Sequence, residues 1–103
     1  MFVRIWLFRP KAGLEDDFEA LYGEKGPWTQ LFQLGQGYLG TKLQRVSLEP
    51  PEYRPIDRWE SRAAWEAFRR EFAALYESLD RRAERVTDME QLVEESDAPE
   101  SDE

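Results

Sequence analysis

The first apolar run of the chain predicts a β-strand. Residues 2–8 read FVRIWLF, are rich in β-branched and aromatic side chains, and are closely followed by a proline. Alternate side chains of a strand share a face, which places Val3, Ile5 and Leu7 on one face and Phe2, Arg4, Trp6 and Phe8 on the other. Because both faces are apolar except at Arg4, the strand is expected to be covered on both sides.

Helical spacing follows the first strand. Leu14, Phe18, Leu21 and Tyr22 form one helical stripe that ends at Gly23, and Pro27 suits the first position of a shorter helix carrying Trp28, Leu31 and Phe32. Three acidic residues, 15–17, occupy the first turn of the longer helix. They are explained by the helix dipole rather than by a metal site, since consecutive helical side chains point in different directions.

Two further strands are predicted in the middle of the chain. Residues 38–48 form the second strand, and the proline pair within residues 49–52 marks a connecting loop. Residues 53–59 form the third strand, with Tyr53, Asp57 and Trp59 on one face and Ile56 on the other. Pro55 cannot donate to a ladder, so it predicts an edge strand or a bulge.

The last elements are one long helix and a short strand. Ser61 is a good N-cap, and the helix that follows carries an apolar stripe at Trp65, Phe68, Phe72, Leu75, Tyr76 and Leu79. A strand is expected over residues 88–93. The order β-α-β-β-α-β is that of an α+β, ferredoxin-like fold with a four-stranded antiparallel sheet.

Charge divides the chain into a balanced body and an acidic end. Its 103 residues carry a net charge of −8, and residues 94–103 contain six acids and no base. We therefore expect one folded domain over residues 1–93 and a disordered acidic tail over residues 94–103. The body lacks the clustered basic face that nucleic-acid binding needs. A basic protein partner for the tail is the alternative to a purely solubilising role.

Composition excludes several kinds of chemistry. The chain has no Cys, no His and no Asn, so zinc-thiolate sites, a Cys nucleophile and a Ser-His-Asp relay are excluded. Gly35, Gly37 and Gly40 precede a strand and do not form a dinucleotide-binding loop. No metal site, cofactor site or membrane span is expected, and the cytoplasm is the simplest location.

The doubly apolar first strand also predicts a partner. A chain of this length supplies helices for one face of the sheet only. The face with Val3, Ile5 and Leu7 is therefore expected to be covered by a second copy, which makes a homodimer.

Three short segments carry a family resemblance. Residues 37–41 (GYLGT), residues 57–61 (DRWES) and the aromatic helix that begins with residues 63–65 (AAW) resemble the antibiotic biosynthesis monooxygenase family, and the resemblance covers about residues 2–93. It implies a dimeric α/β barrel, in which two sheets pack face to face and each protomer has a pocket between its sheet and helices. Some members oxidise anthrones or quinols without a cofactor, others degrade heme, and others have no known activity.

The resemblance also weighs against heme degradation. Members that degrade heme use an Asn on the first strand, a Trp at the end of the third strand and a His on the second long helix. In this chain Trp59 matches the Trp, but Trp6 stands at the Asn position and Tyr76 or Ser78 at the His position. Without His or Asn, that type of heme chemistry is disfavoured.

The candidate site follows from strand parity together with the resemblance. Arg4 and Asp57 share the face that carries Trp59, so they form either a buried structural ion pair or a catalytic set. In the catalytic set Asp57 accepts a proton and Arg4 stabilises an oxyanion. The pocket walls would be Trp6, Trp28, Tyr38, Trp65, Phe68 and Tyr76, which are otherwise core residues.

Two functions remain open at this point. The first is a cofactor-independent monooxygenase that acts on a small aromatic, anthrone- or quinol-like substrate. The alternative is a non-catalytic, dimeric small-ligand-binding or stress-associated module. An open pocket favours the enzyme, whereas a pocket filled by the large aromatic side chains favours the module.

Overall fold

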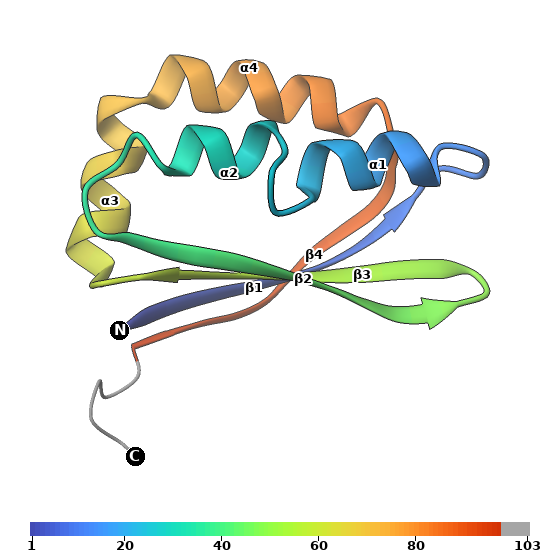
Figure 1. Ribbon diagram of the computed structural model, residues 1–103, viewed down its shortest axis with the longest axis horizontal. Helices are drawn as coiled ribbons and strands as arrows, with labels where there is room; N and C mark the ends of the chain where they lie inside the picture. Colours follow the sequence, from blue (N-terminus) through green and yellow to red (C-terminus); the bar gives the residue numbers. More distant parts are fainter. Residues whose placement is uncertain (98–103) are drawn as a thin grey trace.

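The computed structural model describes residues 1–97, in which four strands form one antiparallel sheet (Figure 1). The spatial order is β2-β3-β1-β4, so β3 and β2 lie on one side of β1 and β4 lies on the other. The strands are β1 (Phe2–Pro10), β2 (Tyr38–Leu48), β3 (Pro51–Trp59) and β4 (Thr87–Asp97). This order and direction confirm the predicted ferredoxin-like sheet.

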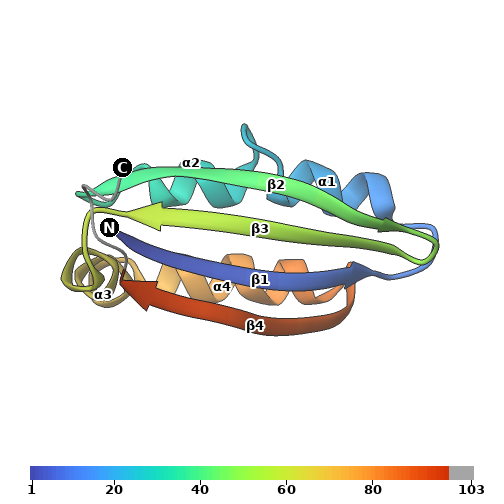
Figure 2. The same cartoon turned by 90° about the horizontal axis from the view of Figure 1, so that it is seen from below.

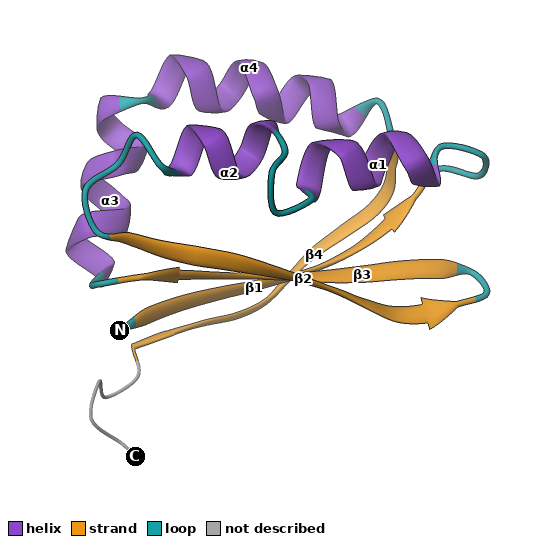
Figure 3. Cartoon of the chain, viewed as in Figure 1, coloured by secondary structure: helices purple, strands orange, loops and turns teal. Residues whose placement is uncertain are grey.

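All helices of the described chain cover the same face of the sheet, as Figures 1 and 3 show. They are α1 (Glu15–Tyr22), α2 (Pro27–Phe32), α3 (Arg62–Glu71) and α4 (Ala73–Glu84). The core lies between these helices and the sheet, and most of its large side chains are aromatic. The α+β architecture is therefore as predicted.

The predicted single long helix is in fact two helices. The backbone leaves the helical range at Phe72, which has φ −111° and ψ 30° and separates α3 from α4. After the break α3 lies at one end of the sheet while α4 runs along it (Figure 1). Trp65 and Phe68 are thus buried at the sheet end and Leu79 over the sheet, whereas Leu75 of the predicted stripe is exposed.

The prediction of an edge or a bulge at Pro55 is wrong. Strand β3 is central and pairs with both β2 and β1. Along β1 the register keeps the same offset from Ile5–Ile56 to Phe8–Tyr53, without a bulge, and the partners of Arg54 and Pro55 are missing from this ladder. The missing proline N–H is therefore accommodated by a local gap in the β1–β3 ladder. Strand β3 also begins earlier than predicted, at Pro51.

The C-terminal strand is longer than predicted. Strand β4 continues to Asp97, and Glu94, Glu95, Ser96 and Asp97 pair in register with the first residues of β1. These four residues were expected to belong to the disordered tail. Their composition is acidic, but pairing with β1 satisfies their backbone groups and brings Glu95 beside Arg4. The rest of the expected tail, residues 98–103, lies outside the described residues.

The second face of the sheet carries no helix in the described chain, as seen from below in Figure 2. Val3, Ile5 and Leu7 of β1 and Ile56 of β3 lie on this face and are partly exposed. Among the described residues, none of the helices is long and apolar enough to cross a bilayer.

Candidate functional site

A cavity of about 120 Å³ lies between the sheet and the helix layer. Every strand, and each of α1, α2 and α4, contributes to its lining, so it exists only in the assembled fold. Its walls are Arg4, Trp6, Phe8, Tyr22, Trp28, Thr29, Phe32, Thr41, Pro55, Asp57, Tyr76, Asp80 and Glu90. For comparison, an apolar cavity of about 150 Å³ is large enough to take benzene. The space suits one aromatic ring.

Asp57 is the buried acid of this cavity, with a residue exposure of 6 %. Burial raises the pKa of its carboxyl to about 6, although the Thr41 hydrogen bond and the Arg4 charge each lower it. A carboxyl of this pKa is ionised at neutral pH and accepts a proton more readily than an ordinary aspartate. Asp57 therefore has the properties of a general base.

A hydrogen-bond chain leads from Asp57 away from the cavity. The Thr41 hydroxyl donates to Asp57 Oδ1 at 2.7 Å, and the Tyr38 hydroxyl lies 2.5 Å from Thr41 Oγ1. A threonine hydroxyl has one proton, so Tyr38 must donate to Thr41 when Thr41 donates to the carboxylate. The chain orients the carboxylate, and it would reverse direction if Asp57 were protonated.

Arg4 is paired with a different acid from the one expected. Its Nε donates to Glu95 Oε2 at 2.7 Å, while Asp57 is its cross-strand neighbour in the register. The ion pairs of the described residues include none between Arg4 and Asp57. The guanidinium carbon lies 4.1 Å from the centre of the Trp65 ring, which adds a cation–π contact. The buried Arg4–Asp57 ion pair of the sequence interpretation is therefore wrong.

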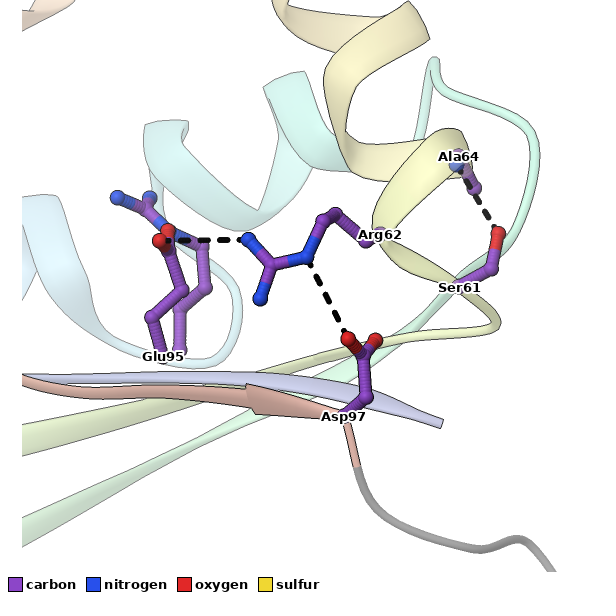
Figure 4. Close-up of polar contacts among 6 residues, drawn as sticks. Ser61, Arg62, Ala64, Glu95 and Asp97 are labelled. Carbon is purple, nitrogen blue, oxygen red and sulfur yellow. Dashed lines mark hydrogen bonds and ion pairs between the residues drawn. The ribbon is translucent and has the colours of Figure 1, made fainter.

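Arg62 continues the same charge network at the end of the sheet. Its Nη1 lies 3.5 Å from Glu95 Oε1 and its Nε lies 3.4 Å from Asp97 Oδ2 (Figure 4). Helix α3 is fixed beside it, because Ser61 accepts a hydrogen bond from the Ala64 N–H, as an N-cap does. The end of β4 is thus tied to both β1 and α3.

Two further acids line the cavity, Asp80 of α4 and Glu90 of β4. Burial raises the pKa of both carboxyls, helped by the charge of Glu84 for Asp80 and by that of Asp80 for Glu90. Tyr76, also in the lining, has a pKa raised by burial and partly lowered again by the Arg4 and Arg69 charges. The lining therefore contains one basic side chain, Arg4, and three acidic ones, Asp57, Asp80 and Glu90.

The predicted site residues divide into two groups. Arg4, Asp57, Trp6, Trp28 and Tyr76 line the cavity. The cavity is not lined by the other four residues that the sequence predicted to contact a ligand, which are Trp59, Tyr38, Trp65 and Phe68. Together with Phe32 they form a packed group, the Trp59 cluster, in which Trp59 is 0 % exposed and its ring centre lies 5.0–5.8 Å from those of its four neighbours.

The sequence analysis missed several residues that line the cavity, and it also missed Glu95, which pairs with Arg4 from outside the lining. Thr41 lies opposite Asp57 on the neighbouring strand β2, and its side chain is on the same face of the sheet. This pairing of strands cannot be deduced from one sequence. Asp80 directly follows the last residue of the predicted apolar stripe and Glu90 lies in the expected strand over residues 88–93, but neither residue was singled out as part of a site. Glu95 was missed because its acidic neighbours resemble a disordered tail, although a buried Arg4 needs a counterion.

The described residues contain no group of three or more His, Cys, Asp or Glu side chains arranged to hold a metal ion. The three acids of the lining come from three different elements, β3, α4 and β4. The chemistry that the lining itself offers is proton transfer by Asp57, charge stabilisation by Arg4 and enclosure by aromatic rings.

Comparison with solved structures shows the fold. SnoaB, a cofactor-independent oxygenase from Streptomyces nogalater, is 14 % identical, with a TM-score of 0.72 over 99 % of this chain and 97 % of that one. A variant of MhuD with two manganese protoporphyrin IX molecules per active site is 22 % identical, with a TM-score of 0.69 over 95 % and 94 %. An uncharacterized NIPSNAP domain protein from Burkholderia xenovorans is 16 % identical, with a TM-score of 0.67 over 98 % and 97 %.

These structures differ in what their names say they bind or do, so the shared fold alone does not select a reaction. No curated protein sequence matches the chain significantly. The family comparison is more specific, because the profile for antibiotic biosynthesis monooxygenases matches residues 1–77 and so includes Arg4, Asp57 and Tyr76. The chain belongs to the antibiotic biosynthesis monooxygenase family.

Proposed function

We propose that this protein is a cofactor-independent monooxygenase for a small aromatic, anthrone- or quinol-like substrate that ionises by losing a proton from a C–H or an O–H group. The observation that carries the proposal is the buried, proton-accepting Asp57 in a cavity walled by aromatic rings. Membership of the family and the fold shared with SnoaB, an oxygenase without a cofactor, support it.

Substrate activation needs only proton removal. A ring of the substrate lies among Trp6, Trp28 and Tyr76, which all line the cavity. The Asp57 carboxylate takes the acidic proton, which belongs to the CH2 group of an anthrone or to the O–H group of a quinol. The negative charge that remains is shared between the substrate oxygen and a carbon conjugated with it. Arg4, in the same lining, stabilises the resulting enolate or phenolate oxygen.

Molecular oxygen is the oxidant. The substrate carbanion gives one electron to O2, and the two radicals combine to form a C–O bond. Protonation yields a hydroperoxide, which loses water and leaves a carbonyl group at the carbon that was CH2 in an anthrone or a ring C–H beside the hydroxyl in a quinol. One oxygen atom of O2 enters the product and the other leaves as water, so atoms and electrons balance without a further reductant.

The size of the cavity limits the substrate. About 120 Å³ is room for one ring, so a quinol-like ring fits best and the outer rings of an anthrone would extend beyond the cavity. A porphyrin macrocycle is far larger than this space. The cavity therefore favours the quinol-like end of the proposed substrate range and weighs against heme.

The non-catalytic alternative has one observation in its favour. Trp59, which carries the match to the site of heme-degrading members, is fully buried in the Trp59 cluster and cannot touch a ligand in the cavity. A small-ligand-binding module would keep the cavity and its rings and make no use of the proton-accepting carboxyl. Turnover decides between the two.

We also propose that two copies pack through the uncovered face of the sheet. Val3, Ile5, Leu7 and Ile56 give this face an apolar centre. Burying several hundred Å² of apolar surface, at roughly 25 cal/mol per Å², stabilises such a dimer by several kcal/mol. Sedimentation at micromolar concentration is expected to show a dimer, and a monomer at that concentration would contradict the proposal.

The function is tested by oxygen uptake with a panel of quinols and anthrones. Wild-type protein is expected to consume O2 with at least one quinol, and Asp57→Asn is expected to lower the rate by roughly 100-fold or more, as for loss of a general base. Asp17→Asn, an exposed acid of α1, is the matched control and keeps the rate. Ligand binding without turnover in wild type would support the binding module instead.

A further inference from the structure

The ion pair of Arg4 is made with an acid outside the cavity lining. Glu95 of β4 binds Arg4 Nε at 2.7 Å, and its side chain is 31 % exposed whereas that of Arg4 is 10 % exposed. Glu95 also binds Arg62 at 3.5 Å, and Arg62 binds Asp97 at 3.4 Å (Figure 4). One carboxylate near the surface is therefore shared between an exposed arginine and the arginine of the cavity.

Contacts with Glu95, Trp65 and Trp6 hold the guanidinium of Arg4. The Glu95 contact occupies Nε, and the Trp65 ring lies 4.1 Å from the guanidinium carbon. Arginine has five N–H donors, so the contact at Nε leaves the terminal nitrogens for other partners. Asp57 is the cross-strand neighbour of Arg4, yet Glu95 takes the ion pair.

We propose that Glu95 is a positioning residue for the cavity: its contact with Arg4 sets where the guanidinium lies and how much of its positive charge acts on Asp57. The inference rests on the proposed function only in assigning a catalytic use to Asp57. The electrostatic link itself is independent of any reaction. It makes the end of β4, which has the composition of a solvated tail, part of the site.

Glu95 acts on Asp57 through the charge of Arg4, and both Arg4 and Asp57 are buried. Arg4 favours the ionised form of Asp57 and lowers its pKa, in opposition to burial. A nearby carboxylate cancels part of the Arg4 charge and so keeps Asp57 a better proton acceptor. The other titratable groups around Asp57 are Tyr38 of β2 through Thr41, Tyr76 and Asp80 of α4, Tyr22 of α1 and Glu90 of β4.

The decisive variant is Glu95→Gln, because the glutamine carbonyl can still accept the Arg4 hydrogen bond while the charge is removed. The pKa of Asp57 is measured directly by NMR titration of its carboxyl carbon. It is expected to fall by about 1 unit, the lower end of the effect of a nearby uncompensated opposite charge. The acidic limb of the kcat/KM profile with a quinol is expected to move down by the same amount.

Two companion variants separate this effect from a general loss of charge or of structure. Glu94→Gln removes an acid from the adjacent position of β4, where Glu94 pairs opposite Ile5 and contacts Ser96, so the Asp57 titration is expected to stay unchanged. Arg62→Gln leaves Glu95 to Arg4 alone, so the Asp57 titration is expected to move upward. Arg62 belongs to α3, which keeps the test usable if Glu95→Gln weakens β4.

An unchanged Asp57 titration in folded Glu95→Gln, or the same shift in Glu94→Gln, would overturn the inference. A downward or absent shift in Arg62→Gln would also contradict it. If the titration moves as expected but no quinol or anthrone is turned over by wild type, the electrostatic link stands and the proposed function fails. If wild type turns over a quinol but the titration does not move, the proposed function stands and the electrostatic link fails.

Discussion

Two aromatic regions lie side by side on the helix-covered face of the sheet, and one of them encloses the cavity that contains Asp57. The Trp59 cluster is closed: Trp59 is 0 % exposed and is surrounded by rings. The other region, around Trp6, Trp28 and Tyr76, encloses about 120 Å³. Phe32 belongs to both and forms the boundary between them.

The two regions differ in their polar groups rather than in the number of their rings. The cavity has Arg4 and Asp57 on neighbouring central strands, and buried charges need polar partners and space for them. The Trp59 cluster has no charged member, and Gly35 lets the loop after α2 approach it closely. A Cβ at Gly35 would lie 2.8 Å from Phe68 Cδ1 and 3.1 Å from Trp59 Cζ3.

The largest effect is expected from emptying the closed region. Trp59→Ala removes a fully buried ring and leaves a void that its neighbours cannot fill, so the free energy of unfolding should fall by about 3–5 kcal/mol. Trp6→Ala is the comparison, because Trp6 is only partly buried and already borders a cavity. Urea denaturation should show the smaller loss for Trp6→Ala, and equal losses would remove the distinction between the regions.

The next largest loss of stability is expected from removing the end of β4, which carries the counterion of Arg4. A chain ending at Val93 loses Glu95 and the pairing of residues 94–97 with β1, so it should lose about 3 kcal/mol, as when one partner of a buried ion pair is removed. A chain ending at Asp97 keeps both contacts and is expected to retain its stability. Thermal and urea unfolding of the two truncations measure this difference, and equal stability would show that residues 94–97 contribute nothing.

Asp57 should make the stability of the cavity region depend on pH. Folding raises its pKa from 3.8 to about 6, so the folded chain binds this proton more tightly than the unfolded chain. Stability therefore declines as pH rises from about 4 to 6, by about 3 kcal/mol for two pKa units, and the loss is complete above pH 6.

Asp57→Asn removes this dependence. Relative to wild type, the variant should gain stability as pH rises from 4 to 7, because it buries no charge at neutral pH. Urea midpoints at several pH values check the prediction. A constant difference between the two proteins across this range would show that the carboxyl does not titrate in the folded state as described.

The smallest effect is expected where the closed region is most tightly packed. Gly35→Ala should cost about 1–3 kcal/mol, as overpacking does, because the new methyl group meets the rings of Phe68 and Trp59. The cavity is separated from this contact by Phe32, so the Asp57 titration should not change. A Gly35→Ala protein as stable as wild type would show that the closed region has room to adjust.

Much of the fold was predictable because its elements are encoded locally. The alternation around Arg4, the proline before Trp28 and the Ser61 cap each specify an element through nearby residues, and the strand over residues 38–48 has the predicted bounds. The site was only half predictable. Parity placed Arg4 and Asp57 on the cavity side, but it could not distinguish rings that line the cavity from rings that fill the core.

The failures have a common cause in contacts between distant segments. Phe72 interrupts a continuous apolar stripe because α3 and α4 cover different parts of the sheet, and Pro55 lies in a central strand because β1 tolerates the gap opposite it. Glu95 is ordered because β1 offers it backbone partners and Arg4 offers it a charge. None of these partners is near in sequence.

The order of the elements, the sides of the central strands and the family depend on periodicity and short motifs, so each can be recognised along the chain without a structure. The acid that neutralises Arg4, the complete burial of Trp59 and the position of the cavity instead depend on contacts between segments that are distant in the sequence. The physical reason is that burial, and with it the pKa of Asp57, depends on everything packed around a residue, and that environment is assembled from every strand and most of the helices.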